Sequence, residues 1–377
     1  MLKSMDSLLG QLLVRVLPSA IPSADDRPPR SILLIRPGGI GDAILLLPAI
    51  RALKAVYPEA AIDILAEKRN DQGFSFSPHI RQVFLYHRAP DLLKVLRRRY
   101  DVVIDTEQWH RLSAVVARLI RSTLRIGYGT NERKRLFTHA VSYSHENYET
   151  DSFFNLLRPL GITAPATSEA PFVEIDHAAR MRAGELLGDL AHRPYAVLFP
   201  GASIPERRWG ADNFRKVAEA LEGEGIPSVI VGGAEDVICG TKIVTGSRGV
   251  NLGGRTSLAE TAAVIDRGAV LVSGDSGILH LGVGLGKPTV SLFGPGIAKK
   301  WAPRGENHIV LNKNLPCSPC TLFGTTPKCP IGARCLQEIT PDQVIAAVMT
   351  LLTRNSDEKS RTQIYAEGAD QARKTES

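Results

Sequence analysis

The chain has 377 residues, of which 44% are hydrophobic and 23% charged, as in a soluble globular protein with room for two domains. No run of eighteen apolar residues occurs, which excludes a membrane-spanning helix. The net charge of +7 favours anionic partners such as nucleotides, phosphorylated glycans, acidic lipid or nucleic acid, although a basic surface also serves solubility alone.

Residues 1–30 are predicted to be an appendage and linker. Their apolar residues have helical spacing but are interrupted by Asp6, Gln11 and Arg15, so no signal peptide is expected. Without an export signal, the five cysteines predict a reducing cytoplasm. The helix fits two interpretations: it docks on the protein itself, or it lies on an acidic membrane surface.

Residues 31–165 predict a first β-α array. A strand over Ser31–Arg36, a helix ending at Tyr57-Pro58 and a strand over Ala61–Ala66 form the unit with which a doubly wound parallel sheet begins. Three further elements are expected: strands over Val83–Tyr86 and Asp101–Asp105, and a helix over Asp91–Arg99. Strands are hard to place between residues 111 and 148, where basic residues crowd.

Residues 171–353 predict a second array, reached through a loose segment at 161–171 that is rich in proline, threonine and alanine. Its expected elements are helices over Asp176–Leu190, Ala211–Glu222 and Leu258–Arg267, and strands over Tyr195–Phe199 and Ser228–Gly232. A last helix, Pro341–Leu352, is a candidate to pack back across both domains. Residues 354–377 are polar and charged, which predicts disorder. The fold class is α/β.

The stretch from Leu271 to Pro295 has the pattern of a phosphate cradle. A strand ends near Ser273, and a turn over residues 274–277 leads into a short helix with Ser276 as its expected N-cap. Free N–H groups and the positive end of the helix dipole meet at this turn, which makes it an anion site. Asp275 stands at the carboxyl end of the strand, where it can accept hydrogen bonds from sugar hydroxyls. The stretch therefore predicts a site for a nucleotide diphosphate.

The turn Gly38-Gly39-Ile40-Gly41-Asp42 follows the first strand and opens the first long helix. A nicotinamide-binding fingerprint would need a glycine at position 44, where an isoleucine stands, and Asp42 would point a carboxylate at the pyrophosphate. We instead expect the backbone of Gly38, Gly39 and Gly41 to approach an acceptor sugar and Asp42 to act as general base. The alternative is that Asp42 only caps the helix.

Four segments resemble family 9 glycosyltransferases, the bacterial ADP-heptose:lipopolysaccharide heptosyltransferases. They are ILLIRPGGIGDAILLLPAIRALKAVYP at 32–58, FPGASIPERRW at 199–209, VGGAED at 231–236 and SGDSGILHLGVGLGKPTVSLFGP at 273–295. Their order is that of the family, and they are spread over residues 32–295. The resemblance implies a GT-B fold, in which two facing Rossmann-like domains enclose a cleft, with the acceptor on the first and the ADP-sugar on the second.

The same resemblance implies roles for individual residues. Asp42 is the implied catalytic base, and Asp105 or Glu107 are the next candidates for that role. Arg207, or Arg208 if the loop is shifted by one, replaces the family's phosphate-binding lysine and keeps its charge. For a ribose contact Glu235 competes with Asp236, and His280 is either a ligand contact or a structural histidine. The donor-binding residues implied are Ser203, Arg207, Arg208, Glu235, Thr256, Asp275, Ser276, Gly277 and His280.

The activity implied is inverting transfer of a heptose or related sugar from an ADP-sugar to a lipopolysaccharide-core or other glycan acceptor. Neither a metal nor a cofactor is expected, since an Asp-x-Asp motif is not evident. The expected partners are the ADP-sugar and an anionic glycan or glycolipid, with no nucleic acid. The expected location is the cytoplasm, where the inner membrane offers a surface for peripheral association. The alternatives are a non-catalytic nucleotide- or glycan-binding module and a family 9 transferase that uses another nucleotide sugar.

Two further groups of residues have open interpretations. Cys317, Cys320, Cys329 and Cys335 have a spacing that permits a four-thiolate zinc site, but the last two are not paired as C-x₂-C, and buried or redox-sensitive thiols are the alternative. The basic runs at 97–99 and 118–135 either bind phosphates, carboxylates or anionic headgroups, or form a solvated surface.

Overall fold

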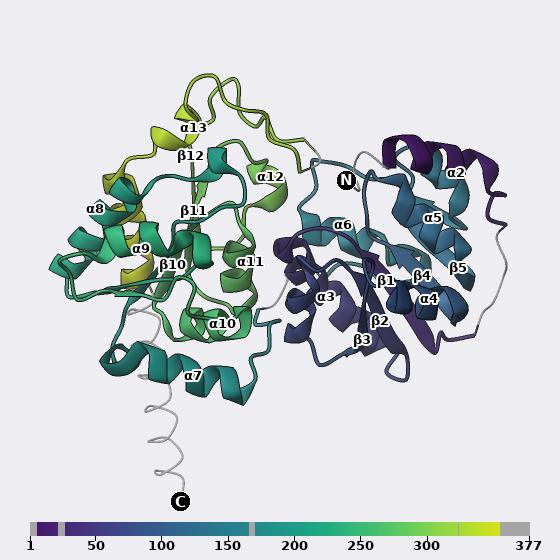
Figure 1. Cartoon of the computed structure of the whole chain (residues 1–377), viewed down its shortest axis with the longest axis horizontal. Helices are drawn as coiled ribbons and strands as arrows, with labels where there is room; N and C mark the ends of the chain where they lie inside the picture. Colours follow the sequence, from purple (N-terminus) through teal and green to yellow (C-terminus); the bar gives the residue numbers. More distant parts are fainter. Residues whose placement is uncertain (1–5, 22–26, 166–169, 323, 355–377) are drawn as a thin grey trace, which may run out of the picture.

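In the computed structural model the described residues are 6–21, 27–165, 170–322 and 324–354. The chain forms a front domain and a rear domain that lie side by side (Figure 1), each built on a six-stranded sheet with helices on its faces. The front domain contains the predicted first array and the rear domain contains the second.

The front sheet has the strand order β3-β2-β1-β4-β5-β6, and all its neighbouring strands are parallel. Its central strand is an almost continuous apolar run buried on both faces, as parallel sheets covered by helices require. The strands are β1 Ser31–Arg36, β2 Ala61–Ala66, β3 Ile80–Leu85, β4 Arg99–Asp105, β5 Arg121–Tyr128 and β6 His139–Val141. The helices are η1 Asp6–Gly10, α2 Gln11–Val16, α3 Ile40–Val56, η2 Asp71–Phe76, α4 Ala89–Arg97, α5 Arg111–Leu119, η3 Glu132–Leu136, α6 Glu149–Asn155 and η4 Arg158–Leu160.

The rear sheet is also parallel throughout, in the order β12-β11-β10-β7-β8-β9. Its strands are β7 Ala196–Phe199, β8 Ser228–Ile230, β9 Val250–Asn251, β10 Val270–Gly274, β11 Thr289–Phe293 and β12 His308–Asn312. Its helices are α7 His177–Leu187, η5 Gly188–His192, η6 Pro205–Arg207, α8 Ala211–Gly223, η7 Ala234–Asp236, α9 Val237–Val244, α10 Leu258–Arg267, α11 Gly277–Gly284, α12 Ala298–Trp301 and α13 Arg334–Gln337.

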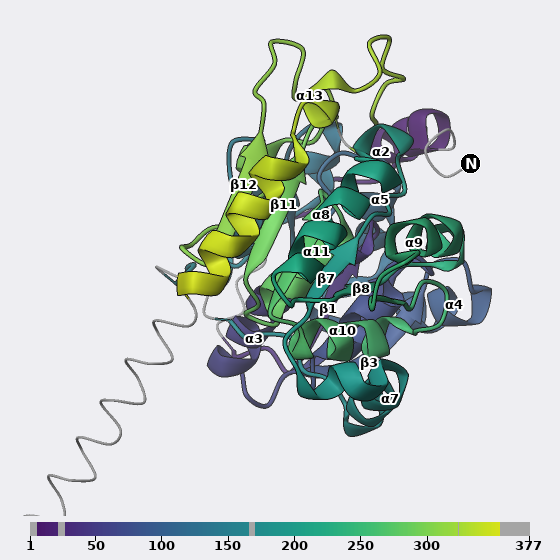
Figure 2. The ribbon, with the colours of Figure 1, turned by 90° about the vertical axis from the view of Figure 1, so that its left-hand side faces the viewer.

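The last helix, residues 341–354, lies beside the rear sheet in Figure 2. Its buried residues Val344 and Val348 share a core cluster with Val290 and Leu292 of β11. The expectation that this helix packs back across both domains is therefore wrong, because its apolar face is used within the rear domain. The predicted disordered tail lies outside the described residues except for Arg354, and residues 166–169 of the predicted hinge also lie outside them.

The domains meet where α3 and α11 begin. A Cβ atom placed on Gly41 would lie 2.6 Å from Cδ2 of His280, and one placed on Gly277 would lie 3.1 Å from the backbone nitrogen of Gly41. Only glycines permit so close an approach, so the two helix starts face each other with the backbones of Gly41 and Gly277 in contact and His280 packed beside them. A single core cluster continues across this junction, with Ile44 on one side and Leu281 on the other.

A second set of contacts joins α12 and the residues after it to α6 and the residues before it. Lys300 forms a buried ion pair with Glu149, and the exposed pairs Lys299–Glu146 and Arg304–Asp151 flank it at 2.5 and 2.8 Å. The Lys300 ammonium also lies 4.4 Å from the centre of the Tyr143 ring, and Gln108 Nε2 donates to the second oxygen of Glu149 at 2.5 Å. Burial raises the pKa of Glu149, whereas Lys300 lowers it. The Lys300 contact with this buried carboxylate is thus made only while the domains are together.

Replacing Lys300 with methionine is expected to lower the free energy of unfolding by about 3–5 kcal/mol, because Glu149 remains buried without its counter-ion. The deficit should grow as the pH rises through the folded-state pKa of Glu149, which burial raises above its ordinary value of 4.5 and which is higher still without Lys300, because the folded wild type then releases a proton that the folded variant retains. Urea unfolding at several pH values measures both effects. Lys299→Met is the control: its pair is 64% and 70% exposed, so a loss below about 1 kcal/mol is expected. Equal losses of unfolding free energy in the two variants would contradict the conclusion that Lys300 neutralises a buried Glu149.

Candidate active site

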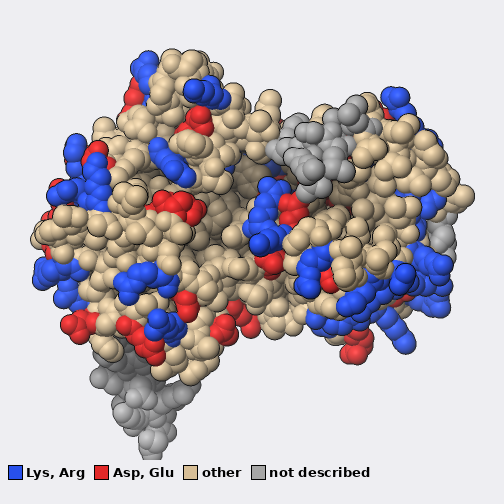
Figure 3. Space-filling view, in the orientation of Figure 1, with Lys and Arg blue, Asp and Glu red and all other residues tan. Residues whose placement is uncertain are grey.

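A cavity of about 590 Å³ lies between the domains, where the space-filling view shows a hollow (Figure 3). Its front wall contains Gly39, Gly41 and Asp42. Its rear wall contains the residues predicted for the donor: Ser203, Arg207, Glu235, Thr256, Asp275, Ser276, Gly277 and His280. The structure therefore brings most of the predicted site together, and it leaves Gly38 and Arg208 outside the cavity lining.

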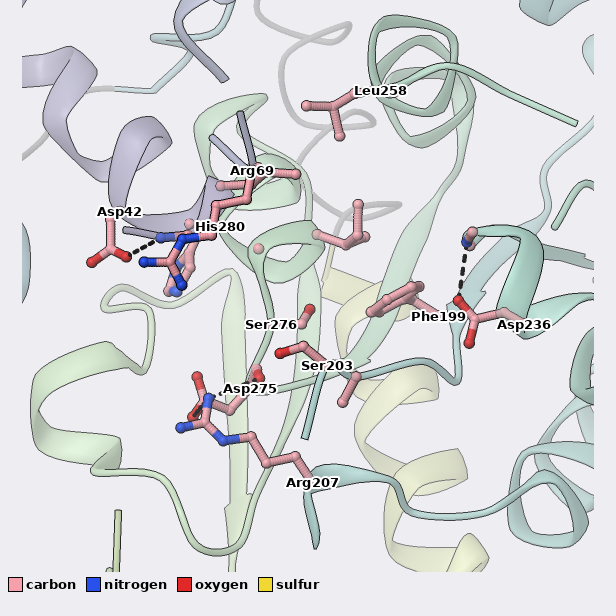
Figure 4. Close-up of a pocket in the computed structure, with 18 of the residues that line it drawn as sticks. Asp42, Arg69, Phe199, Ser203, Arg207, Asp236, Leu258, Asp275, Ser276 and His280 are labelled. Carbon is pink, nitrogen blue, oxygen red and sulfur yellow. Dashed lines mark hydrogen bonds and ion pairs between the residues drawn. The ribbon is translucent and has the colours of Figure 1, made fainter. Parts of the chain in front are cut away.

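Asp42 lies in the first turn of α3 (Figure 4), and its two oxygens have different partners. Oδ2 accepts a hydrogen bond from the backbone N–H of Gly39 at 2.8 Å, so the predicted alternative, helix capping, is one of its roles. Oδ1 pairs with Arg36, whose side chain is 3% exposed while that of Asp42 is 18% exposed. Nη1 of Arg36 donates to the carbonyl of Thr106 at 2.6 Å, which fixes the guanidinium. The carboxylate is consequently held in one orientation while still lining the cavity.

Gly38 has a backbone role. Its φ of +143° is strained for any residue with a side chain, and a Cβ atom there would lie 2.8 Å from Oδ2 of Asp42. It shapes the turn that presents Asp42, it does not line the cavity, and its contact with an acceptor stays a prediction.

Asp275 and Arg207 form an ion pair on the rear wall, with 2.9 Å between Oδ2 and Nη1 (Figure 4). Burial raises the pKa of Asp275, and Arg207 lowers it. Arg208 instead is exposed, and its Nε donates to the carbonyl of Ala202 at 2.9 Å. Of the two arginines considered for the phosphate, only Arg207 lines the cavity.

The start of α11 faces the cavity, as the sequence predicted. Ser276 is the N-cap, and its hydroxyl accepts from the backbone N–H of Leu279 at 3.2 Å and shares a hydrogen bond with Ser273 at 2.9 Å. The N–H groups of the first turn point toward the N-terminal end of the helix, where an anion is stabilised by them and by the helix dipole.

His280 lies one turn into α11 and is almost completely buried. Burial lowers its pKa to about 4, so the ring is neutral at neutral pH. Among the described residues its Nδ1 has no hydrogen-bond partner, and its ring centre is 6.0 Å from that of Trp301. The histidine thus packs against the start of α3 and also lines the cavity.

Glu235 and Asp236 have different surroundings on the rear wall. Asp236 is buried and accepts from the backbone N–H of Gly233 at 3.0 Å, so it holds the turn after β8. Glu235 is exposed, and its carboxylate is available to a ligand in the cavity. Thr256 also lines the cavity, and its hydroxyl bonds to that of Thr261 at 2.9 Å.

Several lining residues were not predicted, among them Arg69, Phe199, Trp301 and Thr321. Arg69 follows the carboxyl end of β2, the sheet edge where α/β proteins bind ligands, and that position was the available signal. Arg69 also lines a second cavity of about 790 Å³ in the front domain, together with Lys68, Tyr86, His87 and His110. The two cavities are therefore neighbours that share one arginine.

Asp105 and Glu107, the alternative candidates for the catalytic base, both have structural partners. Asp105 is fully buried and paired with Arg133. One oxygen of Glu107 accepts from the backbone N–H groups of Gln108 and Trp109, both at 3.0 Å. Glu107 lines the second cavity, and Asp105 lines neither.

The four clustered cysteines are free thiols that range from exposed Cys317 to buried Cys335. Burial raises the pKa values of Cys320 and Cys335. Within the described parts of the chain, no three His, Cys, Asp or Glu residues are arranged to hold a metal ion, and the zinc interpretation stays a prediction. Of the helices in the described ranges, none is both long and apolar enough to cross a membrane.

Comparison with known proteins places these features in a family context. The profile of glycosyltransferase family 9 (heptosyltransferase) matches residues 90–329. Lipopolysaccharide heptosyltransferase 3 of Escherichia coli K12 is 30% identical over 293 residues, which are 71% of this chain and 84% of that protein. Lipopolysaccharide heptosyltransferase 2 of Salmonella typhimurium is 25% identical over 289 residues, 70% of this chain and 82% of that protein.

Solved structures share the fold. The family 9 glycosyl transferase of Veillonella parvula aligns with a TM-score of 0.72 and 23% identity, over 86% of this chain and 97% of its own. The E. coli ADP-heptose lipopolysaccharide heptosyltransferase II aligns with a TM-score of 0.72 and 22% identity, over 86% of this chain and 99% of its own. The E. coli heptosyltransferase WaaC with ADP aligns with a TM-score of 0.67 and 18% identity, over 85% of this chain and 99% of its own. The expected GT-B fold of two Rossmann-like domains is confirmed.

Gly41→Ala is expected to destabilise the protein by about 1–3 kcal/mol, because the new methyl group would lie 2.6 Å from the ring of His280 and force the helix starts apart. Gly39→Ala is the matched control, since its methyl group would meet only Asp42 Oδ2, at 3.5 Å. Denaturant unfolding of both variants measures the difference. A Gly41 variant as stable as the Gly39 variant would show that the helix starts do not touch.

Proposed function

The chain belongs to glycosyltransferase family 9, and from this premise we propose that it transfers a heptose or related sugar from an ADP-sugar to a glycan of the lipopolysaccharide core. Transfer inverts the anomeric carbon and requires no metal. Residues 31–165 hold the acceptor and residues 171–353 the donor. The observation that carries the proposal is that Asp42 of the front domain and Arg207 of the rear domain line one cavity.

The rear wall supplies the groups that a nucleotide diphosphate needs. Arg207 and the first turn of α11 provide positive charge and N–H donors for the pyrophosphate, and Ser203 and Ser276 add hydroxyl groups. Glu235 and Thr256, at the other side of the same wall, take the ribose and the base. ADP as the nucleotide is supported by the solved relative that carries ADP and shares the fold.

Chemistry takes place across the gap between the two walls. Asp42 removes the proton of an acceptor hydroxyl as its oxygen forms a bond to the anomeric carbon. The bond from that carbon to the diphosphate oxygen breaks on the opposite face, and its electron pair leaves with ADP. Arg207 and the helix start stabilise the negative charge that develops there. Arg36 keeps the Asp42 carboxylate aimed at the acceptor, a positioning role.

The acceptor occupies the second cavity. It adjoins the donor cavity at Arg69, and its lining combines the cationic Lys68 and Arg69 with His87, His110 and the carboxylates of Asp6, Glu67 and Glu107, of which Glu67 pairs with Arg69. The two cations can contact a phosphate or carboxylate of the acceptor, and the carboxylates can contact its hydroxyl groups, one of which then reaches Asp42 past Arg69. The basic surface of the same domain is consistent with an anionic acceptor, and a glycolipid acceptor would bring the enzyme to a membrane surface.

Asp42→Asn is expected to lower the rate of transfer from ADP-heptose by about 10²–10⁴-fold, because the amide keeps the size and the bond to Gly39 N–H but cannot take a proton. ADP affinity, measured by calorimetry, should change little, since Asp42 stands on the opposite wall. A rate close to that of the wild-type enzyme would remove Asp42 as the base.

Arg207→Gln is expected to weaken ADP binding by about 10–100-fold, the usual effect of losing a charged hydrogen bond. Arg208→Gln is the matched control, because its side chain does not line the cavity and donates to the carbonyl of Ala202. Thermal shift at several ADP concentrations gives both affinities. A similar loss of ADP affinity in both variants, or a larger loss in the Arg208 variant, would contradict the assignment of Arg207 as the phosphate contact.

A further inference from the structure

The amino-terminal segment carries apolar side chains on two faces. Val14 is fully buried in the cluster that includes Ala114 and Ala117 of α5, and Gly10 is buried beside it. On the outer face, the exposed side chains recur at helical spacing and form an apolar ridge, which consists of Leu9, Leu12, Leu13 and Val16. Leu12 and Val16 are 59% and 71% exposed. The docked-helix prediction is confirmed by the inner face, but it leaves the ridge unexplained.

The ridge is held in place by bonds from the folded domain. Asp6 accepts from the backbone N–H of Leu112 at 2.7 Å, at the start of α5. At the other end, Nε of Arg118 donates to the carbonyl of Pro18 at 3.0 Å, and Nη1 of Arg135 donates to that of Arg15 at 3.0 Å. The backbone N–H of Ala20 donates to the Arg135 carbonyl at 2.8 Å. The segment is anchored so that its outer apolar side chains stay in water.

Positive charge borders the ridge. Arg15, Lys134 and Arg135 are exposed around it, and the neighbouring acid, Glu132, is already paired with Arg111 at 2.8 Å. Figure 3 shows the surface over α2 and α5 as mainly uncharged, with basic side chains at its edge. An apolar strip with a cationic border is complementary to a lipid surface that has acyl chains beneath anionic headgroups.

We propose that the apolar ridge docks the front domain on the surface of an anionic lipid bilayer. Leu12 and Val16 enter the boundary between headgroups and acyl chains, and Arg15, Lys134 and Arg135 contact the headgroups. The purpose of such docking rests on the proposed function, because it brings the acceptor-binding domain to an acceptor carried by lipid. The contact itself depends only on the ridge and its charges.

Vesicle flotation tests the proposal with the full chain and equimolar phosphatidylglycerol and phosphatidylcholine. The wild-type protein should float with these vesicles and not with phosphatidylcholine alone, and binding should fall as salt is raised. The double variant L12S/V16S should bind at least about tenfold more weakly, since each buried methylene contributes about fourfold to partitioning. Arg15→Glu with Lys134→Glu should also weaken binding, as each cation near the surface contributes about fivefold.

The matched control is M181S/I238S, which replaces two side chains of the rear domain that are 55% and 85% exposed. It should bind vesicles like the wild type, and all variants should keep the wild-type unfolding midpoint. Equal weakening in both double variants, or failure of the wild type to float, would overturn the proposal. Loss of self-association in L12S/V16S with unchanged flotation would also overturn it, by assigning the ridge to a second copy of the chain.

A separate measurement distinguishes this proposal from the proposed function. L12S/V16S should transfer sugar to a soluble, deacylated acceptor at the wild-type rate, but it should need about tenfold more vesicle-bound acceptor for half-maximal rate, matching its weaker partitioning. Vesicle binding without any transfer by the wild type would leave the docking intact and reject the transferase. Transfer that is equally impaired on both acceptors would reject the docking role of the ridge.

Discussion

The contact on which the rest of the structure depends is the meeting of two helix starts. Gly41 at the beginning of α3 and Gly277 at the beginning of α11 lack side chains, and the backbones approach so closely that a Cβ atom on Gly277 would lie 3.1 Å from the nitrogen of Gly41. Because parallel sheets place their helix starts at the carboxyl edges of their strands, this contact turns both functional edges toward one gap. A carboxylate from one domain and an anion-binding turn from the other thereby line the same cavity.

Charges around the gap are arranged in pairs that keep each group in place. Arg36 is buried and pairs with Asp42, while Arg207 pairs with Asp275. At the far side, Lys300 and Glu149 bury an ion pair between the domains. Such a pair adds little net stability compared with apolar residues, but breaking it is costly, so it favours one relative orientation of the domains. The same orientation is the one in which Asp42 faces the rear wall.

The sequence predicted the regular parts of the fold because their patterns are local. The strand Ser31–Arg36 and the helix Leu258–Arg267 have the predicted bounds, and Ser276 caps α11 as expected. Strand β5 was missed because Arg125 interrupts its apolar run, β12 because only three apolar residues stand between His308 and Asn312, and β9 because it has only two residues. Register and packing across domains are not encoded in such local patterns.

Some residues of the candidate site could be predicted from local sequence patterns, and others could not. Asp42, Asp275 and Ser276 stand in turns whose residues can be identified from spacing, and the structure places all three in the cavity. Arg69 and Trp301 reach the cavity from segments without a motif, and only the assembled sheets bring them there. The Lys300–Glu149 pair joins residues far apart in the chain, so neither residue could be distinguished from an ordinary surface charge.

The anomeric configuration of the product is the measurement that tests the central claim most directly. If one carboxylate and one anion-binding turn face each other across a single sugar, attack and departure occur on opposite faces. Proton NMR of the glycan formed from ADP-heptose should then show inverted configuration at the transferred sugar. Retained configuration would contradict the account, because it requires a second displacement or a same-face attack that this arrangement of Asp42 and Arg207 does not provide.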